Sequence, residues 1–346
     1  MSENKQRSMS VKEISTDIEN LFSKDEAQTI RLKRLKKQPW RSFYSIFVPK
    51  SKRKLEQQQA NALQKVQVAN HWDTFLDQYF QGNLTHFDLN PKKQFADQKI
   101  IWQYWGQGLA AAEQNETVKL CFASVDRFKN DYQVIRLDEE SVKEYLDLPE
   151  FVWEKKKNAQ FKPAFFADLI RLALLDVYGG VWIDATILLT APMDENILNQ
   201  DFFMFHRDQN TQNKLVWEQF NGDYFGWHDR HYVNVLNSFI VAKKNNKMVH
   251  ICFEIMMNYW KTQNAIPHYF IFQIMFNELT KRDVWDEPMF ILDDTLPHLL
   301  QIRLKEKFDQ HEFINIVNQT SIHKINYIDE YSLESFFNFL IRKYTD

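Results

Sequence analysis

One stretch constrains the fold of this chain more than any other part: PAFFADLIRLALLDVYGGVWIDATILLT, residues 163–190. Its leading proline suits the first turn of a helix, where the missing N–H costs nothing. Residues 164–178 are nearly all apolar, which predicts a helix that is covered on most sides. Gly179 and Gly180 predict the end of this helix, because glycine accepts cap conformations that other residues resist. Residues 181–183 then predict a short buried strand.

Three charged side chains interrupt this apolar stretch. Asp168 and Arg171 are three positions apart, so they project from neighbouring points on one face of the helix. A buried helix has little reason to carry a lone ion pair, since buried charges need compensation. Asp184 follows at the carboxyl end of the strand, where open α/β sheets place their ligands. The residue types alone leave two interpretations open: a structural ion pair beside a turn-capping aspartate, or a binding site built from all three.

The string ADLIRLALLxxYGGVWIDAT resembles the core signature of the capsular polysaccharide synthesis glycosyltransferases. These are similar to a wider group of GT-A-fold sugar transferases, whose typical pattern is (S/A)DxxRxxxLxxxGGxYxDxD. Asp168, Arg171, the two glycines and Asp184 match that pattern. Thr186 stands where the wider group has a second aspartate, and the capsular branch commonly has D-A-T at this place. The resemblance implies an α/β fold with a GT-A-type, Rossmann-like mixed sheet flanked by helices.

The resemblance also implies roles for these side chains in a reaction that releases a nucleoside diphosphate. Asp184 would bind a divalent cation, Mn²⁺ or Mg²⁺, together with the donor diphosphate, since such cations prefer carboxylate and phosphate oxygens. Asp168 would hold sugar or ribose hydroxyls, and Arg171 would contact the donor sugar or phosphate. Thr186 would reach the cation through water or orient Asp184. Asp168, Arg171 and Asp184 are therefore the predicted catalytic residues.

Two further motifs match the two ends of the family pattern. Residues 100–105 predict the first strand, and IWQYWGQG resembles the family's opening IWQxWxxG. In GT-A transferases the end of this strand contacts the nucleoside, which makes Gln103 and Trp105 candidates for donor binding. Near the other end of the chain, SIHKI resembles the closing (V/I)HK(L/I) motif. It implies that His323 and Lys324 lie over the donor diphosphate and that His323 supplies the metal ligand that Thr186 does not.

Two residues are predicted on the acceptor side of the cleft. Residues 235–242 predict a strand that lies beside the acceptor in the family, and Asn237 is the candidate within it. The sequence PHYFIFQIMFNEL predicts a helix whose opening resembles a YF pattern of the family, which Tyr269 matches. The pair of Asp293 and Asp294 is interpreted as a turn or a helix cap rather than as a metal site.

The remaining apolar patterns predict strands that alternate with helices, which is typical of an α/β sheet. Strands are expected at residues 117–125, 132–137 and 202–206, and helices at 138–146, 247–262 and 329–344. The polar segment 210–229 is interpreted as a mobile loop over a site. We predict an N-terminal helical extension over residues 1–95, and the resemblance implies a GT-A-like glycosyltransferase domain over residues 96–346.

The extension carries a basic segment with aromatic residues, 31–54, after an amphipathic helix expected within residues 1–30. The basic segment contains ten Lys or Arg and no Asp or Glu, although the whole chain has a net charge of −3. Basic clusters around aromatic rings favour an anionic membrane surface, where each cation contributes about 1 kcal/mol. A solvated basic linker is the second interpretation. A nucleic-acid-binding arm is disfavoured, because the rest of the chain is acidic and shows no nucleic-acid-binding fold.

The composition indicates a globular chain in a reducing compartment. Hydrophobic residues make up 44% of 346 residues, which is enough for a sizeable core. The two cysteines, Cys121 and Cys252, form no disulfide framework. The sequence has no apolar run of about 18 residues and no apolar signal core at its start. The expected location is the cytoplasm, with peripheral contact at the inner face of the membrane.

These patterns favour a glycosyltransferase of capsular or cell-surface polysaccharide synthesis. It would move a sugar from a nucleotide-sugar donor to a glycan or lipid-linked glycan acceptor, and the wider group implies a hexose transferred with retention of configuration. One alternative is a non-catalytic relative that binds sugar nucleotides at the membrane, which the D-A-T substitution leaves open. The other is a metal-dependent phosphohydrolase, which needs several clustered carboxylates or histidines where the sequence places only Asp184.

Overall fold

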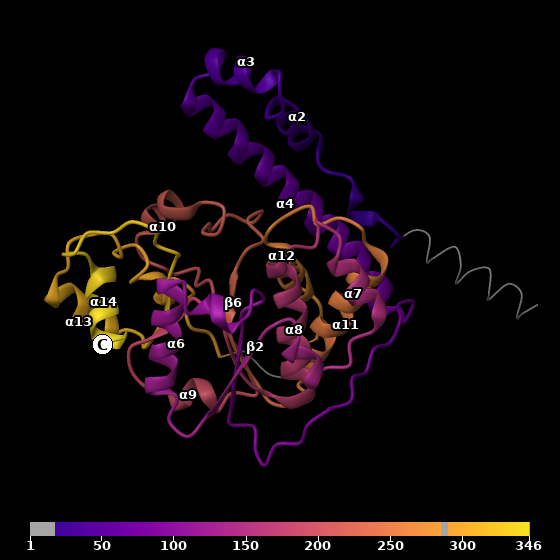
Figure 1. Cartoon of the computed structure of the whole chain (residues 1–346). Coiled ribbons are helices and arrows are strands. Elements are labelled where there is room, and N and C mark those ends of the chain that lie inside the picture. Colours follow the sequence, from indigo (N-terminus) through magenta and orange to yellow (C-terminus); the bar gives the residue numbers. More distant parts are fainter. Residues whose placement is uncertain (1–17, 285–289, 346) are drawn as a thin grey trace, which may run out of the picture.

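The computed structural model describes residues 18–284 and 290–345 of the chain (Figure 1). Much of the amphipathic helix expected within residues 1–30 lies outside the described residues. The described part of that region forms a 3-10 turn, η1 (Leu21–Ser23), and helix α2 (Ala27–Leu35). Phe22 of η1 is fully buried against the rings of Trp72 and Tyr259, so this turn belongs to the body of the protein.

The centre of the fold is a mixed five-stranded sheet in the order β2–β1–β3–β6–β5. The strands span β1 (Ile100–Tyr104), β2 (Gln133–Leu137), β3 (Gly180–Ile183), β5 (Phe202–His206) and β6 (Val235–Ala242). β1 is parallel to both β2 and β3, whereas β6 is antiparallel to β3 and β5. The carboxyl ends of β1 and β3 therefore meet at one edge of the sheet. A separate ribbon pairs β4 (Ile187–Leu189) with β7 (Ile322–Lys324).

Helices cover both faces of this sheet, so the predicted α/β class is confirmed (Figure 1). One side carries α7 (Glu150–Lys156), α8 (Pro163–Tyr178), α11 (Lys247–Thr262) and α12 (Ile271–Leu279). The other side carries α6 (Glu116–Phe128), α13 (Gln310–Val317) and α14 (Phe336–Thr345). Short helical segments connect these elements: α5 (Leu109–Ala112), η2 (Ser141–Glu144), α9 (Glu195–Leu198), α10 (Lys214–Asn221) and η3 (Leu296–His298).

The buried helix expected after Pro163 is confirmed as α8, with the residues at which the sequence predicts its start and end. Its C-terminal glycines are required by the backbone. Gly179 and Gly180 have φ angles of 71° and 103°, which side chains with a Cβ resist. A Cβ on Gly180 would also lie 2.5 Å from the carbonyl oxygen of Ile100, so β3 can pair closely with β1 only because this position is glycine.

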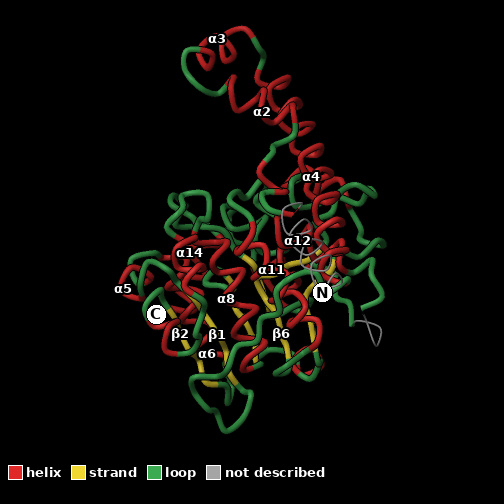
Figure 2. The backbone as a smooth tube through the Cα atoms, turned by 90° about the vertical axis from the view of Figure 1, so that its right-hand side faces the viewer, coloured by secondary structure: helices red, strands yellow, loops and turns green. Residues whose placement is uncertain are grey.

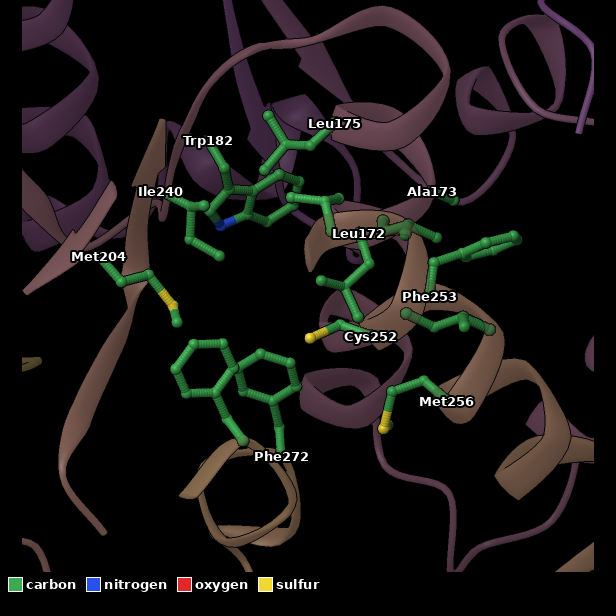
Figure 3. Close-up of a cluster of buried hydrophobic side chains, with 14 of the residues drawn as sticks. Leu172, Ala173, Leu175, Trp182, Met204, Ile240, Cys252, Phe253, Met256 and Phe272 are labelled. Atoms are coloured by element: carbon green, nitrogen blue, oxygen red, sulfur yellow. The ribbon is translucent and has the colours of Figure 1, made fainter. Parts of the chain in front are cut away.

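Apolar side chains of α8 form the centre of the core. Leu172 and Leu175 point toward Trp182 of β3 and Ile240 of β6, and Met204 of β5 closes the cluster (Figure 3). All five side chains are at most 2% exposed. Removing apolar surface from water on this scale stabilises the fold by roughly 1.5–3 kcal/mol for each large side chain. The core therefore fixes the rotation of α8, and with it the direction of its charged residues.

The strand expected at residues 117–125 is wrong, because this segment is helix α6. Its buried positions include Val118, Cys121, Phe122 and Val125, a spacing that follows one face of a helix rather than one face of a strand. The Asn115 side chain accepts a hydrogen bond from the Val118 N–H at 3.1 Å and caps the helix. That cap is the sequence signal that identifies the segment as a helix.

Two other local expectations need correction. The helix expected at residues 138–146 is only the 3-10 turn η2, and the segment 210–229 contains the helix α10. The strands expected at 132–137 and 202–206 are present as β2 and β5, and the helix expected at 247–262 is present as α11. The helix expected at 329–344 is present only from Phe336 onward, as α14, so its predicted start is wrong.

The N-terminal helices extend away from the body (Figures 1 and 2). Helices α3 (Trp40–Phe47) and α4 (Lys50–Phe80) follow α2. Only the second half of α4 is buried, and the Nε1 atom of Trp72 donates to the Ile271 carbonyl of α12 at 3.0 Å. This half belongs to the same hydrophobic core as the sheet, and the boundary near residue 95 stays a prediction. Over residues 18–284 and 290–345, no helix combines the length and apolar character that a membrane span needs.

Candidate active site

A cavity of about 610 Å³ lies at the edge where the carboxyl ends of β1 and β3 meet. Its walls come from the end of β1, the first half of α8, the residues that follow β3, the start of β6, α12, and the chain after β7. The predicted residues that line it are Trp105, Asp168, Arg171, Asp184, Thr186, Asn237, Tyr269 and Lys324. The fold thus brings together side chains from six separate segments of the sequence.

Arg171 joins the two aspartates at the floor of the cavity. Its Nη1 atom lies 3.2 Å from Oδ1 of Asp168, and its Nη2 atom lies 3.2 Å from Oδ1 of Asp184. The Trp182 Nε1–H donates to the same Asp184 oxygen at 2.7 Å. The side chain of Arg171 is 5% exposed, whereas that of Asp184 is 23% exposed. Asp184 is therefore held in place by two donors and still reaches the cavity.

Asn237 extends this network toward α12. Its Nδ2–H donates to Oδ1 of Asp168 at 2.9 Å, its Oδ1 accepts from Nε2 of Gln273 at 2.9 Å, and its backbone carbonyl accepts from Nη1 of Arg171 at 2.6 Å. All four side chains are buried. Asn237 therefore lines the cavity and also contacts Asp168 and Arg171, the residues predicted to bind the nucleotide-sugar donor.

Burial raises the pKa of Asp168 to about 6, and the Arg171 guanidinium partly offsets this effect. The nearby carboxylate of Asp184 also raises it. Around neutral pH the Asp168 carboxyl is ionised. It accepts one hydrogen bond from Asn237, pairs with the Arg171 guanidinium, and leaves acceptor capacity for a hydroxyl donor. This suits a group that binds sugar hydroxyls.

Lys324 supplies a second cation to the cavity. It is the last residue of β7, whose pairing with β4 places Lys324 opposite Ile187. Its Nζ atom contacts the Thr186 hydroxyl. Burial lowers the pKa of Lys324, while the Asp184 carboxylate acts in the opposite direction. The ribbon of β4 and β7 therefore links the D-A-T sequence to the HK motif.

Aromatic rings also line the cavity. The Trp105 and Tyr327 rings meet edge to face, with 6.1 Å between their centroids. Tyr269 is 66% exposed and lies 6.3 Å from the Phe165 ring, centroid to centroid. Such rings offer apolar faces to planar bases or sugar rings.

Two predicted site residues do not line the cavity. Gln103 is fully buried on the other face of β1, where its Oε1 accepts from Nε of Arg136 at 3.0 Å. Neighbouring residues of a strand point to opposite faces, so Gln103 turns away from the space that Tyr104 enters. His323 is also fully buried outside the cavity, with Nε2 3.0 Å from the Thr190 hydroxyl. The expectation that His323 and Asp184 share a metal ion is therefore wrong.

Several lining residues were missed by the sequence reasoning. They include Tyr104, Gln273, Tyr224, His298, Gln301, Asn326 and Tyr327. Tyr327 follows Lys324 of the HK motif by three positions. This closeness to a predicted site segment is the sequence feature that could have identified it. Tyr224 belongs to a loop that is held by a buried ion pair between Arg207 and Asp294, which no local pattern announced. The Asp293 side chain accepts from the Thr295 N–H in a turn, as expected. The same expectation is wrong for Asp294, because its carboxylate pairs with Arg207 instead of capping a turn or a helix.

The cavity offers a fit for one divalent cation on Asp184. Arg171 and Trp182 both contact this carboxylate at Oδ1, and Oδ2 forms no hydrogen bond to protein in the part of the chain that the structure describes. Of the described acidic residues, Asp168 and Asp184 line the cavity. Mg²⁺ and Mn²⁺ sites often use one or two carboxylates and take their other oxygens from substrate phosphates and water. The donor set therefore suits a cation that arrives with a diphosphate.

Among solved structures, the chain is similar to the PaToxG glycosyltransferase, with 13% sequence identity and a TM-score of 0.30 over 65% of this chain and 80% of that chain. No curated protein matches. The family described as "Capsular polysaccharide synthesis protein" matches residues 51–341. That match spans most of the chain and includes every residue of the cavity, so this protein belongs to the capsular polysaccharide synthesis family.

Proposed function

We propose that this protein is a glycosyltransferase that moves a sugar from a nucleotide-sugar donor to a glycan or lipid-linked glycan acceptor during capsule synthesis. Membership of the capsular polysaccharide synthesis family supports the pathway. One observation supports the chemistry above all: the Asp184 carboxylate lines a cavity together with two cations, Arg171, which pairs with it, and Lys324, which contacts the neighbouring Thr186. That arrangement suits a divalent cation and the diphosphate of a leaving nucleotide.

The charges of this cavity match the charge that develops in glycosyl transfer. As the bond between the sugar and the diphosphate breaks, negative charge grows on the diphosphate oxygens. Asp184 would hold Mn²⁺ or Mg²⁺, which supplies Lewis acid stabilisation of that charge when bound. Arg171 and Lys324 would donate to the phosphate oxygens. Thr186, next to Lys324, would orient that ammonium or a metal-bound water.

The remaining side chains sort into a donor side and an acceptor side. Asp168, held by Asn237, would accept from hydroxyls of the sugar or ribose. The rings of Trp105 and Tyr327 would contact the nucleobase, and the exposed ring of Tyr269 would contact the acceptor. We propose a hexosyl donor and retention of configuration. NMR of the product tests the first by the identity of the transferred sugar and the second by its anomeric configuration.

A groove leads from the cavity toward the N-terminal helices. Residues of α2 and α4 line one side of it and residues 221–223 and 267–270 line the other, and it shares Asn221, Tyr269 and Phe270 with the cavity. Helix α3 at the far end exposes Phe43, Ile46 and Phe47 within the basic segment 31–54. We propose that this helix contacts anionic lipids at the inner face of the membrane, which would bring a lipid-linked acceptor to the groove.

A donor screen tests the proposed activity. Purified full-length protein is incubated with a panel of sugar nucleotides, in Mn²⁺, in Mg²⁺ and in chelator, and free nucleoside diphosphate is measured. We expect metal-dependent release from one donor. Asp184→Asn should lower that rate at least about 100-fold, because it removes the carboxylate that would hold the cation. The matched control Asp201→Asn changes an exposed carboxylate that pairs with Lys243 outside the cavity, and should leave the rate unchanged.

Other outcomes of the screen identify the alternatives. Donor binding in a melting assay without turnover, with acceptor glycans present, would favour a non-catalytic relative. Release of inorganic phosphate would favour a metal-dependent phosphohydrolase. The geometry argues against the phosphohydrolase, since the only described carboxylates of the cavity are Asp168 and Asp184, and Arg171 holds both.

A further inference from the structure

A second group of metal-ligating side chains lies outside the cavity. His86 belongs to the segment between α4 and β1, while His250 and Glu254 are four residues apart on α11. One ligand atom from each of the three lies within 4.8 Å of the others. None of the three lines the cavity. The sequence pattern gave no sign of this group, because His86 is more than 160 residues from its partners along the chain, as the numbering of the three residues shows.

Glu254 is the fixed point of the group. Its side chain is 6% exposed, the Tyr79 hydroxyl donates to its Oε2 at 2.7 Å, and the Phe87 N–H donates to its Oε1 at 3.0 Å. The Nδ1 atom of His86 contacts Oε1, and Nε2 of His250 lies 3.7 Å from Oε2. A carboxylate held by a backbone N–H and a tyrosine keeps one orientation, and both imidazoles approach it.

His250 carries the support that metal-binding histidines require. Its Nδ1 atom lies 2.9 Å from Oδ2 of Asp176, a buried carboxylate near the end of α8. When Nδ1–H donates to that carboxylate, Nε2 keeps its lone pair and faces Glu254. Zinc sites usually have this arrangement: one ring nitrogen of the histidine binds the metal, and the other donates to a carboxylate in the outer shell.

The charges of the group also favour a cation. Asp176 and Glu254 are both 5% exposed, and buried carboxylates need compensating positive charge. With both histidines neutral, the lone pair of His250 Nε2 would face an anionic oxygen. A divalent cation between them removes this repulsion and balances both carboxylates.

We propose that His86, His250 and Glu254 bind a zinc ion, with Asp176 as the outer partner of His250. Two imidazole nitrogens and one carboxylate oxygen form a ligand set that zinc accepts, and a fourth position stays open to water. This position is accessible, because the side chain of His86 is 75% exposed. The proposal does not depend on the proposed function, since it uses none of the residues of the cavity.

Such an ion would fasten three parts of the structure together. His86 holds the segment that connects the N-terminal helices to β1, His250 and Glu254 lie on α11, and Asp176 belongs to α8. The same α8 carries Asp168 and Arg171 in its first half. Bound zinc would therefore clamp the N-terminal region onto the helix that positions the candidate active site.

Direct metal binding tests this proposal. Tag-free, full-length Asp184→Asn protein, which lacks the cavity carboxylate, is stripped with chelator and titrated with Zn²⁺, and with Co²⁺ as a spectroscopic probe. We expect one zinc ion per chain and the visible absorption bands of tetrahedral Co²⁺. His86→Ala and His250→Ala should each weaken zinc binding at least about 100-fold, and Asp176→Asn about 10- to 100-fold, the usual range for an outer partner.

Two controls keep the test decisive. His311→Ala removes an exposed histidine on α13 and should change nothing. In chelator, His86→Ala should melt at the temperature of the parent protein, and zinc should raise only the parent's melting temperature, because a ligand stabilises the state that binds it. Zinc binding that is unaffected by His86→Ala would overturn the proposal. So would the absence of stoichiometric binding, which would leave a plain ion pair between protonated histidines and Glu254.

Discussion

Arg207 and Asp294 form a two-point ion pair in which both side chains are completely buried. Nε of Arg207 lies 2.6 Å from Oδ1 of Asp294, and Nη2 lies 2.8 Å from Oδ2. The Tyr224 hydroxyl donates to the same carboxylate at 2.9 Å. Arg207 also donates to the carbonyls of Tyr224 and Gly226. The pair therefore anchors the loop between β5 and β6, which forms one wall of the cavity.

Breaking this pair should destabilise the protein strongly. Asp294→Asn leaves the Arg207 charge buried without its counter-charge, and such losses cost about 3–5 kcal/mol. Urea unfolding followed by fluorescence measures the change in the free energy of unfolding. Asp131→Asn is the control, since Asp131 pairs with Lys99 on the surface, where a pair contributes about 0–1 kcal/mol. Equal small effects for both variants would contradict this role.

Lys324, rather than His323, should determine affinity for a nucleoside diphosphate. Lys324→Met removes a cation that lines the cavity, and hydrogen bonds to charged groups contribute about 1.5–3 kcal/mol, so affinity should fall roughly 10- to 100-fold. Calorimetric titration with the diphosphate of the active donor measures this. His323→Asn should lower the melting temperature, because His323 is fully buried, and leave diphosphate affinity within about twofold. The reverse pattern would restore the original expectation for His323.

Stability should decrease as the pH falls below about 6.5. Burial lowers the pKa of His231, His268, His298 and His323 from 6.5 to about 3. Between these values the unfolded chain binds protons that the folded chain does not. Each histidine therefore removes about 1.4 kcal/mol of stability per pH unit as the pH falls. The raised pKa values of Asp168 and His250 act in the opposite direction, but they are two groups against these four.

Urea unfolding at pH 7.5, 6.5 and 5.5 measures this slope. His268→Gln should reduce the loss of stability between pH 6.5 and 5.5 by about 1 kcal/mol, because one group no longer titrates and the full slope of about 1.4 kcal/mol per pH unit is reached only at lower pH. The exposed His311 provides the matched control, and His311→Gln should leave the slope as it is. A free energy of unfolding that is flat over this range would show that the buried histidines are protonated in the folded state.

Helix α3 should attach the protein to anionic vesicles. Phe43 and Phe47 are 58% and 75% exposed and stack on one face, with ring centroids 6.4 Å apart. Replacing both by serine should weaken binding to phosphatidylserine vesicles at low salt at least about tenfold, since burying a phenylalanine contributes about 1.5–3 kcal/mol. Vesicle sedimentation measures this. Leu215→Ser on α10 is the control, as Leu215 is 70% exposed away from the basic segment. Unchanged binding of the double variant would exclude α3 as the contact.

The sequence predicted the parts of the structure whose determinants are local. The α8 helix and its glycine stop follow from an uninterrupted apolar run and two residues that tolerate positive φ angles. The sequence also predicted one site for Asp168, Arg171 and Asp184. The first two lie on the same helix, α8, and Asp184 follows β3, the next element along the chain. The apolar residues of α6 also alternate, which predicts a strand, and only the Asn115 cap distinguishes the segment as a helix.

The rest depends on contacts between distant segments. Gln103 and Trp105 are two positions apart, yet only the second lines the cavity, since the chain leaves the regular pleat after Tyr104. His323 and Lys324 differ by a single position, and the register of β7 against β4 decides which of them faces the cavity. A one-residue change of register exchanges the two faces of a strand, and the sequence of β7 alone does not fix it.

Helix α4 has a geometrical consequence for the acceptor. Its first buried residue is Ala60, so the turns from Lys50 onward separate α3 from the body by about 15 Å, at 1.5 Å per residue. A protein that rests on a bilayer through α3 would hold its cavity above the headgroups by at least this stand-off. A sugar attached directly to a short lipid diphosphate would fall short of the cavity, whereas an oligosaccharide of several units would span the gap. The length of helix α4 would then set a minimum length for the acceptor glycan, so that the acceptor would have to be a chain already started by another transferase.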